Sequence, residues 1–218
     1  VRVEVYLEGP SDVFAMEKLL APLVQRKRRE GVGIKFFRAR KGDGKAYLVN
    51  IAPVDAANTL PMDSGVTMVV VPDLYPKDKP ARHETPQELE TLVLGNFRKA
   101  LEDRGRSYSD DLTQRFKVFC FKHELEALLL AVPDRLAHRL GLGSLKPNWR
   151  QPVEDQNHEH PPKQVVQALF RRHKKVAYVE TSEAPAILAG ADYQAIAQAC
   201  PQCFQPLVAF LESCGAVA

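Results

Sequence analysis

Several features that would assign this chain of 218 residues to a familiar class are scarce or missing. The four cysteines are too few for the disulfide framework of a small secreted domain. No run of about eighteen apolar residues occurs, so the sequence predicts no membrane span. The first residues predict a strand and a turn rather than a signal peptide. We therefore expect a cytoplasmic protein without a membrane partner.

Aromatic residues are also few, at 8%, and no stretch of them suggests a platform on which nucleic-acid bases would stack. The formal net charge is only +3, which excludes neither nucleic acid nor an acidic partner. The basic residues are nevertheless clustered, in segments 26–29, 38–45 and 171–175. Such clusters are usually solvated faces, and binding to phosphate is the alternative for each of them.

Nucleotide-binding motifs are missing as well. Lys41 and Lys45 flank Gly42 and Gly44 in a loop that is a candidate for cradling phosphate. The loop lacks the Gly-Lys-Ser/Thr ending of a P-loop, so the chain has no ATP-binding motif. We keep Lys41 as a candidate substrate-binding residue.

The pair Cys200 and Cys203 forms a CxxC motif, for which zinc binding and redox chemistry are the functional interpretations. The motif lies between two helical patterns rather than after a strand, and no convincing second pair of ligands is visible. We therefore interpret it as the boundary of a core-packing helix with partly buried thiols, and we predict that it binds no zinc.

What the chain does contain is an alternation of apolar, β-rich runs with helical patterns. This order predicts right-handed crossovers and an α/β fold with a mainly parallel sheet of about four strands and helices on both faces. The expected strands are 3–7, 34–39, 66–71 and 116–121, and the expected helices are 13–24, 45–58 with a break near Pro53, 86–104 and 123–132.

The pattern changes after residue 132. Helices are expected at 133–140, 162–173, 192–199 and 204–213, with only a weak strand at 176–179. We expect an α/β core over residues 1–132 and a helical extension over residues 133–218, packed together as one structural domain.

Three acids, Glu8, Asp73 and Glu124, each lie just past the end of an apolar strand run. Parallel strands bring their carboxyl ends to the same edge of the sheet, which is where open α/β folds place their sites. Clustered carboxylates repel one another, and a divalent cation stabilises such a group. The sequence therefore predicts that these acids bind Mg²⁺ or Mn²⁺ and are catalytic in phosphodiester chemistry.

Four further side chains are candidates for the same edge. Asp12 is either a metal ligand or the cap of the first helix. Glu126 is either a metal ligand or part of a solvated helix face. For His123 three roles stay open: orienting a carboxylate, contacting phosphate and capping the helix. Lys163 opens a helix after a polar loop, where it either binds substrate phosphate or is an ordinary surface lysine.

These segments resemble the Toprim fold, the catalytic α/β domain of topoisomerases, primases and overcoming-lysogenization-defect (OLD) nucleases. The resemblance rests on Glu8-Gly9 after the first strand, Asp73 after a later core strand, and the sequence HELEALL from His123. The chain is more closely similar to a bacterial family of uncharacterised small Toprim-like proteins, of the domain-of-unknown-function kind. Motifs supporting this span nearly the whole chain: Glu8–Asp12, Asp73–Pro76, His123–Leu129, Pro161–Gln164 and Cys200–Phe204.

The chain departs from the Toprim pattern at one position. Toprim enzymes commonly carry Asp-x-Asp, whereas here Asp73 is followed two residues later by Tyr75, which cannot replace a carboxylate as a magnesium ligand. If two metals bind, the second set of ligands must come from Asp78, Glu124 or Glu126.

The resemblance implies a magnesium-dependent nuclease that acts on DNA or RNA, with an ATPase as a plausible partner protein. The alternative is a non-catalytic, protein-binding module that has kept the fold and lost the metal chemistry, which the missing second aspartate favours. Primase-like nucleotidyl transfer is a third interpretation, weakened by the absence of a zinc or template-binding domain. The oligomeric state stays open.

Overall fold

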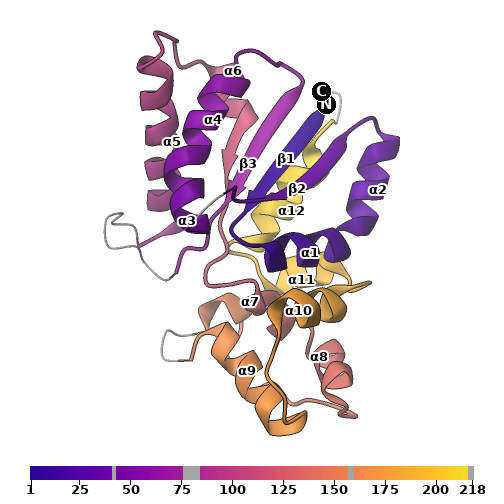
Figure 1. Ribbon diagram of the computed structural model, residues 1–218. Helices are drawn as coiled ribbons and strands as arrows, with labels where there is room; N and C mark the ends of the chain where they lie inside the picture. The colour runs from indigo at the N-terminus through magenta and orange to yellow at the C-terminus, as the bar shows by residue number, and fades with distance from the viewer. Residues whose placement is uncertain (41–42, 76–83, 157–159, 216–218) are drawn as a thin grey trace.

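The computed structural model describes residues 1–40, 43–75, 84–156 and 160–215. Within these ranges four strands form one sheet, in which all neighbouring strands are parallel and the order is β2-β1-β3-β4 (Figure 1). The strands are β1 (Arg2–Leu7), β2 (Gly33–Arg38), β3 (Val66–Val71) and β4 (Phe116–Val118). The mainly parallel α/β sheet predicted from the sequence is confirmed.

The register of the two central strands explains why the first site residues meet. Leu7, the last residue of β1, pairs with Val71, the last residue of β3. The chain that follows each strand therefore leaves the sheet at the same edge. β4 is shorter than expected, but an isolated bridge between Asp73 and Phe121 continues the pairing beyond its end.

Alternating side chains of the strands enter two hydrophobic cores, one on each face of the sheet. Val69 and Val71 belong to the first core, whereas Met68 and Val70 belong to the second. The second core is closed by the π-helical segment η1 (Tyr47–Ile51) and three helices: α4 (Ala52–Thr59), α5 (Pro86–Glu102) and α6 (Asp110–Arg115). Both faces of the sheet are thus covered, as parallel sheets require.

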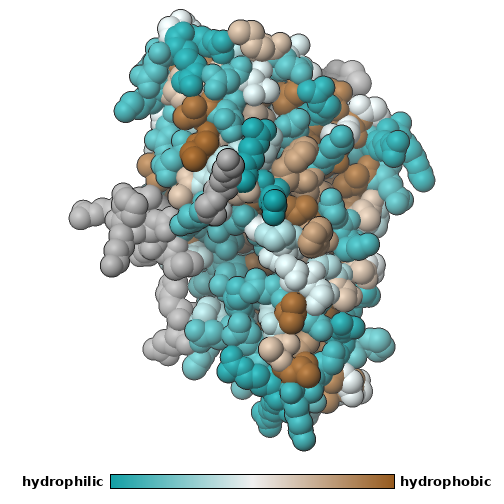
Figure 2. All heavy atoms as spheres, in the orientation of Figure 1, coloured by the Kyte–Doolittle hydropathy of each residue, from teal (hydrophilic) through white to brown (hydrophobic). Residues whose placement is uncertain are grey.

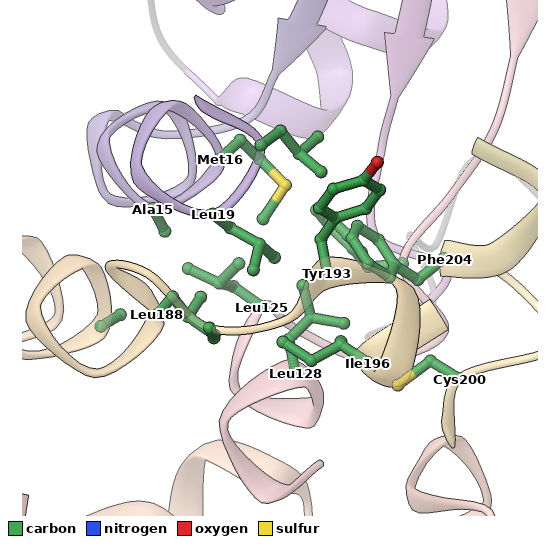
Figure 3. Packing of buried hydrophobic residues seen from close by; sticks show 14 of the residues in the cluster. Ala15, Met16, Leu19, Leu125, Leu128, Leu188, Tyr193, Ile196, Cys200 and Phe204 are labelled. Atoms are coloured by element: carbon green, nitrogen blue, oxygen red, sulfur yellow. The ribbon is translucent and has the colours of Figure 1, made fainter. Parts of the chain in front are cut away.

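The first core draws on helices from both halves of the sequence. It joins Leu19 of α1 (Pro10–Leu19) and Leu128 of α7 (Glu126–Leu130) to Leu188 of α10 (Glu180–Leu188). Figure 3 shows these side chains converging with those of Ile196 and Phe204. The remaining helices that contribute are α2 (Ala21–Arg29), α8 (Pro133–Leu140), α9 (Pro162–His173), α11 (Tyr193–Ala199) and α12 (Phe204–Ser213). The predicted helical extension therefore shares its core with the sheet.

Prolines account for two differences between the predicted and observed helices. The expected helix 13–24 is two helices, because Pro22 opens α2 and lacks an N–H to continue α1. Pro53 likewise cannot bond to the carbonyl of Val49, and the chain before it forms the π-helical segment η1. The side chain of Asn96 donates to that carbonyl over 2.9 Å, so the group is satisfied.

Other predicted elements were wrong in extent or kind. Residues 123–125 precede α7 rather than belonging to it. The weak strand at 176–179 is not a strand; it leads into α10, which the sequence interpretation missed because Pro185 lies inside that helix. The short helices α6 and α3 (Gly44–Ala46) and the 3₁₀ turn η2 (Val153–Asp155) were not predicted separately. Across the described residues, every helix is too short or too polar to span a membrane.

Candidate active site at the carboxyl edge of the sheet

Glu8 and Asp73 lie side by side where β1 and β3 end. The backbone N–H of Asp73 donates a hydrogen bond of 2.8 Å to Oε1 of Glu8. This bond uses one carboxylate oxygen of Glu8 and leaves the other for a ligand. The two side chains are close enough that the charge of Glu8 raises the pKa of Asp73.

Asp12 joins this pair from the first turn of α1. The helix begins at Pro10 with Gly9 as its N-cap, so neither Ser11 nor Asp12 is the cap residue. Asp12 reaches back instead, and its Oδ2 accepts the N–H of Gly9 over 2.9 Å. Asp12 therefore has the structural role of a capping-box acid, with its second oxygen left for another partner.

The first residue of α3, Gly44, approaches the end of β1 very closely. A Cβ atom on Gly44 would lie 2.5 Å from the carbonyl oxygen of Glu8, so only glycine fits at this position. The next residue, Lys45, is buried and its Nζ donates to the carbonyl of Leu74 over 3.3 Å. The charge of Lys45 lowers the pKa of Glu8. Lys45 thus lies inside the site, whereas Lys41 and Asp78 lie outside the described residues.

Glu124 and Glu126 reach the same edge. Glu124 lies just before α7, and Glu126 is the first residue of that helix. The expected helix does not include Glu124, whose carboxylate accepts the backbone N–H of Lys163. Glu126 is 2% exposed, and its Oε1 accepts the hydroxyl of Tyr178 over 3.0 Å. Glu126 is therefore buried and hydrogen-bonded, which rules out the interpretation of a solvated helix face.

Lys163 is held at this edge by an acid that the sequence interpretation missed. Its Nζ lies 2.5 Å from Oε1 of Glu180, and both side chains are about a third exposed. Glu180 is the first residue of α10. No sequence signal singled it out, because the segment before it predicted a weak strand and the helix itself was not recognised. Lys163 is therefore an ion-paired residue of the site rather than a solvated surface lysine.

The beginnings of α1, α9 and α10 converge below the sheet (Figure 1). Asp12, Lys163 and Glu180, one from the first turn of each helix, act electrostatically on one another. Helix N-termini carry partial positive charge, which favours carboxylates and other anions nearby. The fold thus offsets part of the acidic charge with helix dipoles and two lysines, Lys45 and Lys163.

The acids still raise one another's pKa values. Burial is the largest cause for each, and it raises the pKa of Glu8 to about 7, that of Asp12 to about 6 and that of Glu126 to about 7. Burial also raises the pKa of Asp73 well above its ordinary value, and the charges of Glu8, Asp12, Glu124 and Glu126 raise it further. The pKa of Glu124 is raised mainly by burial. Burial therefore favours the protonated form of all five carboxyl groups.

The oxygen atoms of this group suit a hard divalent cation such as Mg²⁺ or Mn²⁺. One atom specifically lacks a partner: Oε2 of Glu124 is buried and, within the described part of the chain, accepts no hydrogen bond. Buried polar atoms are rarely left in this state without a ligand. Among the same residues, no group of three His, Cys, Asp or Glu side chains is already arranged to hold a metal. A cation would have to draw the carboxylates together.

His123 and Tyr75 form the wall beside the acids. Their rings are 5.2 Å apart, and His123 is buried. Together with Lys122 and Arg150 they line a hollow of about 610 Å³. The residue that replaces the second aspartate of the Toprim pattern, Tyr75, thus contacts the histidine next to Glu124.

The CxxC cysteines and residues of the first basic cluster, 26–29, pack against or bond to other parts of the protein. Cys200 and Cys203 are buried rather than partly buried, and Sγ of Cys203 lies 3.6 Å from Sγ of Cys120. In the cluster 26–29, Arg26 pairs with Glu212 at 3.0 Å, and buried Lys27 donates to the carbonyl of Cys214 over 2.9 Å. This cluster therefore helps to hold the C-terminal helix.

Sheet order, parallel pairing and the flanking helices together define an α/β fold with a four-stranded parallel sheet. The chain matches the family described as Domain of unknown function (DUF4276) over residues 7–212, and it belongs to that family. No curated protein matches the chain.

Two solved structures are similar to the chain over nearly its full length. One is the C-terminal region of the Burkholderia pseudomallei OLD protein, at 14% identity, with 98% of each chain covered and a TM-score of 0.51. The other is the C-terminal region of the Xanthomonas campestris pv. campestris OLD protein, at 14% identity, with 99% of this chain and 95% of that chain covered and a TM-score of 0.46. At such low identity, the first likeness shows a shared fold.

Proposed function

We propose that this protein is a nuclease that uses a divalent cation, Mg²⁺ or Mn²⁺, to cleave phosphodiester bonds of nucleic acid. The observation that carries the proposal is the group of five carboxyl groups at the carboxyl edge of the sheet, whose pKa values are raised by burial and by one another. An unliganded group of this kind is costly to keep in a folded protein. Function explains its presence better than stability does.

Glu8, Asp73 and Glu124 would hold the cation. The carboxylate of Glu8 is fixed by the hydrogen bond that it accepts from the backbone N–H of Asp73, and Glu124 contributes the buried oxygen without a partner. A bound divalent cation supplies positive charge that stabilises the negative charge developing on the phosphate and favours ionisation of the attacking water. Asp12 and Glu126, which raise the pKa of Asp73, would complete the set of ligands or accept a proton.

The cationic groups of the site would bind the substrate backbone. Lys163 lies in the first turn of α9, where the helix dipole also favours a phosphate. His123, which lines the neighbouring hollow with Lys122 and Arg150, would contact the same strand. These residues would hold the scissile phosphate against the carboxylates, which is the orientation that the reaction requires.

A non-catalytic binding module is the second candidate function. It is favoured by Tyr75 in place of a second acid and by the absence, among the described residues, of three side chains already arranged around a metal position. In that case the fold would present this edge to a partner protein. A separate ATPase is a plausible partner in either case, because the similarity in fold is to part of an OLD protein and this chain has no ATP-binding motif of its own.

A cleavage assay distinguishes the two functions. Wild-type protein should cut DNA or RNA in Mg²⁺ or Mn²⁺ and be inactive in EDTA, and Asp73→Asn should abolish cutting without unfolding the protein. Glu102→Gln is the matched control, because Glu102 is an exposed acid on α5. Equal activity of the Asp73→Asn and wild-type proteins would refute the proposal. Cation binding without cleavage of any nucleic acid would support the binding module.

A further inference from the structure

A groove runs along α9, between this helix and the loop that carries Trp149. Its volume is about 800 Å³, within the range of about 300–1,000 Å³ for binding sites of small organic groups. α9 lies in the lower part of the molecule, whose visible face is mostly hydrophilic (Figure 2). We call this feature the α9 groove; its lining residues include Lys146, Asn148, Trp149, Gln164, Arg171 and Arg172.

The charge of the α9 groove has one sign. Lys146, Arg171 and Arg172 are exposed and line it, and His160 and His173 lie beside them. No aspartate or glutamate is among the described residues that line the groove. This contrasts with the small net charge of the whole chain, which is +3. The groove is therefore an anion-attracting surface, suited to a chain of phosphates.

Trp149 gives the groove an aromatic wall. Its Nε1 donates to the carbonyl of Leu130 over 3.1 Å, which fixes the ring against the body of the protein. The ring is half-buried and also lines the groove. A fixed aromatic side chain next to arginines is a surface on which a nucleic-acid base can stack. The sequence alone suggested no stacking platform, and a single tryptophan placed by the fold offers a candidate for one.

Amide side chains complete the lining. Asn148, Gln164 and Gln167 face the groove with both donors and acceptors. Such groups can bond to the edges of bases that are not paired with another strand. Cations, one aromatic ring and amides together match the phosphate, the flat face and the polar edge of a nucleotide.

The α9 groove meets the hollow that His123 and Tyr75 line. Gln156 lines both this groove and the hollow that contains His123 and Arg150. It is fixed there, because its Oε1 accepts the N–H of Arg150 over 3.0 Å and its Nε2 donates to the carbonyl of His160 over 2.8 Å. At the beginning of α9, Gln164 of the groove directly follows Lys163 of the acidic site. A bound strand can thus extend from the groove to the acids.

We propose that the α9 groove binds a single strand of unpaired nucleotides, with its phosphates on Arg171, Arg172 and Lys146 and a base stacked on Trp149. A duplex would offer phosphates but keep its base faces buried, so it would not use the tryptophan. The inference rests on the proposed function in that the strand would be the substrate. Binding without metal nevertheless tests it separately from cleavage.

The test measures binding of a twelve-nucleotide oligo(dT) and of a duplex of the same length to the full chain in EDTA. Trp149 is the single tryptophan of the chain, so its fluorescence reports the groove alone. We expect the oligonucleotide to quench this fluorescence. Arg171→Ala/Arg172→Ala should weaken binding by roughly tenfold or more, and should reduce the slope of log affinity against log salt by about 1.4, since each phosphate contact on a single strand contributes about 0.7.

Arg28→Ala/Arg29→Ala is the matched control, because it removes the same charge from exposed positions on α2, and it should leave the tryptophan quenching intact. Melting temperatures establish that all variants are folded. The proposal is overturned if the wild-type protein does not bind, if binding leaves the tryptophan unchanged, if the duplex binds as tightly, or if both double variants lose affinity equally. Tight, quenching binding in EDTA together with no cleavage in Mg²⁺ would support the groove and refute the nuclease.

Discussion

The backbone N–H of Asp73 donates a 2.8 Å hydrogen bond to the carboxylate of Glu8, which links the ends of two neighbouring parallel strands. The bond favours the ionised form of Glu8, yet burial raises the pKa of the same group to about 7. The two acids are therefore held together in surroundings that resist their charges. A positive charge between them would relieve this conflict.

Asp73→Asn should stabilise the metal-free protein at neutral pH. The substitution removes a charge that Glu8, Asp12 and Glu124 repel, while the backbone N–H that donates to Glu8 is kept. A gain of about 1 kcal/mol would raise the melting temperature by about 2–4 °C for a chain of this size. Thermal unfolding in EDTA measures the change, with Glu102→Gln as the control. A lower melting temperature for Asp73→Asn would show that Asp73 is structurally required.

The metal-free protein should lose stability as the pH rises from about 4 to about 7. Glu8 and Glu126 have folded-state pKa values near 7, above their ordinary value of 4.5. In this interval the folded state holds more protons than the unfolded state, so the free energy of unfolding falls with rising pH. Urea unfolding at several pH values tests this, and the fall should be smaller in Glu8→Gln. An identical pH dependence in both proteins would contradict the raised pKa of Glu8.

Gly44→Ala should disturb the site while leaving the rest of the fold in place. The new methyl group would lie 2.5 Å from the carbonyl oxygen of Glu8, and overpacking against backbone costs about 1–3 kcal/mol. Gly143→Ala is the matched control, because a Cβ there meets no atom within 4 Å. Urea unfolding should show the loss in Gly44→Ala alone. Equal stability of the two variants would mean that the start of α3 does not pack on Glu8 as described.

Tyr178→Phe should destabilise the protein more at pH 8 than at pH 5. The hydroxyl of Tyr178 donates to Glu126, and this bond is strongest when Glu126 is ionised, above its pKa of about 7. The loss should be about 1–3 kcal/mol at the higher pH, since a buried carboxylate loses its hydroxyl donor. Tyr108→Phe keeps the ring contact with Phe97 and is the control. A loss that does not depend on pH would assign Tyr178 a packing role.

The parallel sheet and the meeting of Glu8 with Asp73 could be predicted from the sequence, because both depend on local patterns. Apolar runs specify buried strands, and the carboxyl ends of adjacent parallel strands share an edge. The helix 162–173, which carries Lys163, was also predicted with its observed bounds. For this helix, the spacing of the apolar residues and the prolines at its start predict the same structure.

The parts that could not be predicted depend on contacts between distant segments. Glu124 is kept out of α7 while its carboxylate accepts the N–H of Lys163, a bond with no counterpart in local sequence. Glu180 enters the site only because α10 packs against α1. Trp149 becomes a wall of the α9 groove through its bond to Leu130. Such residues carry no local pattern that distinguishes them from ordinary loop or helix positions.

Titration of the protein with Mn²⁺, followed by the electron paramagnetic resonance of the free ion, shows whether the carboxyl groups at the edge of the sheet bind a divalent cation. We expect saturable binding by the wild-type protein and by Glu102→Gln, and loss of binding in Asp73→Asn. Binding should weaken as the pH falls below about 6, because protons compete for Glu8 and Asp12. No saturable binding by the folded wild-type protein at pH 8, or unchanged binding by Asp73→Asn, would contradict this expectation.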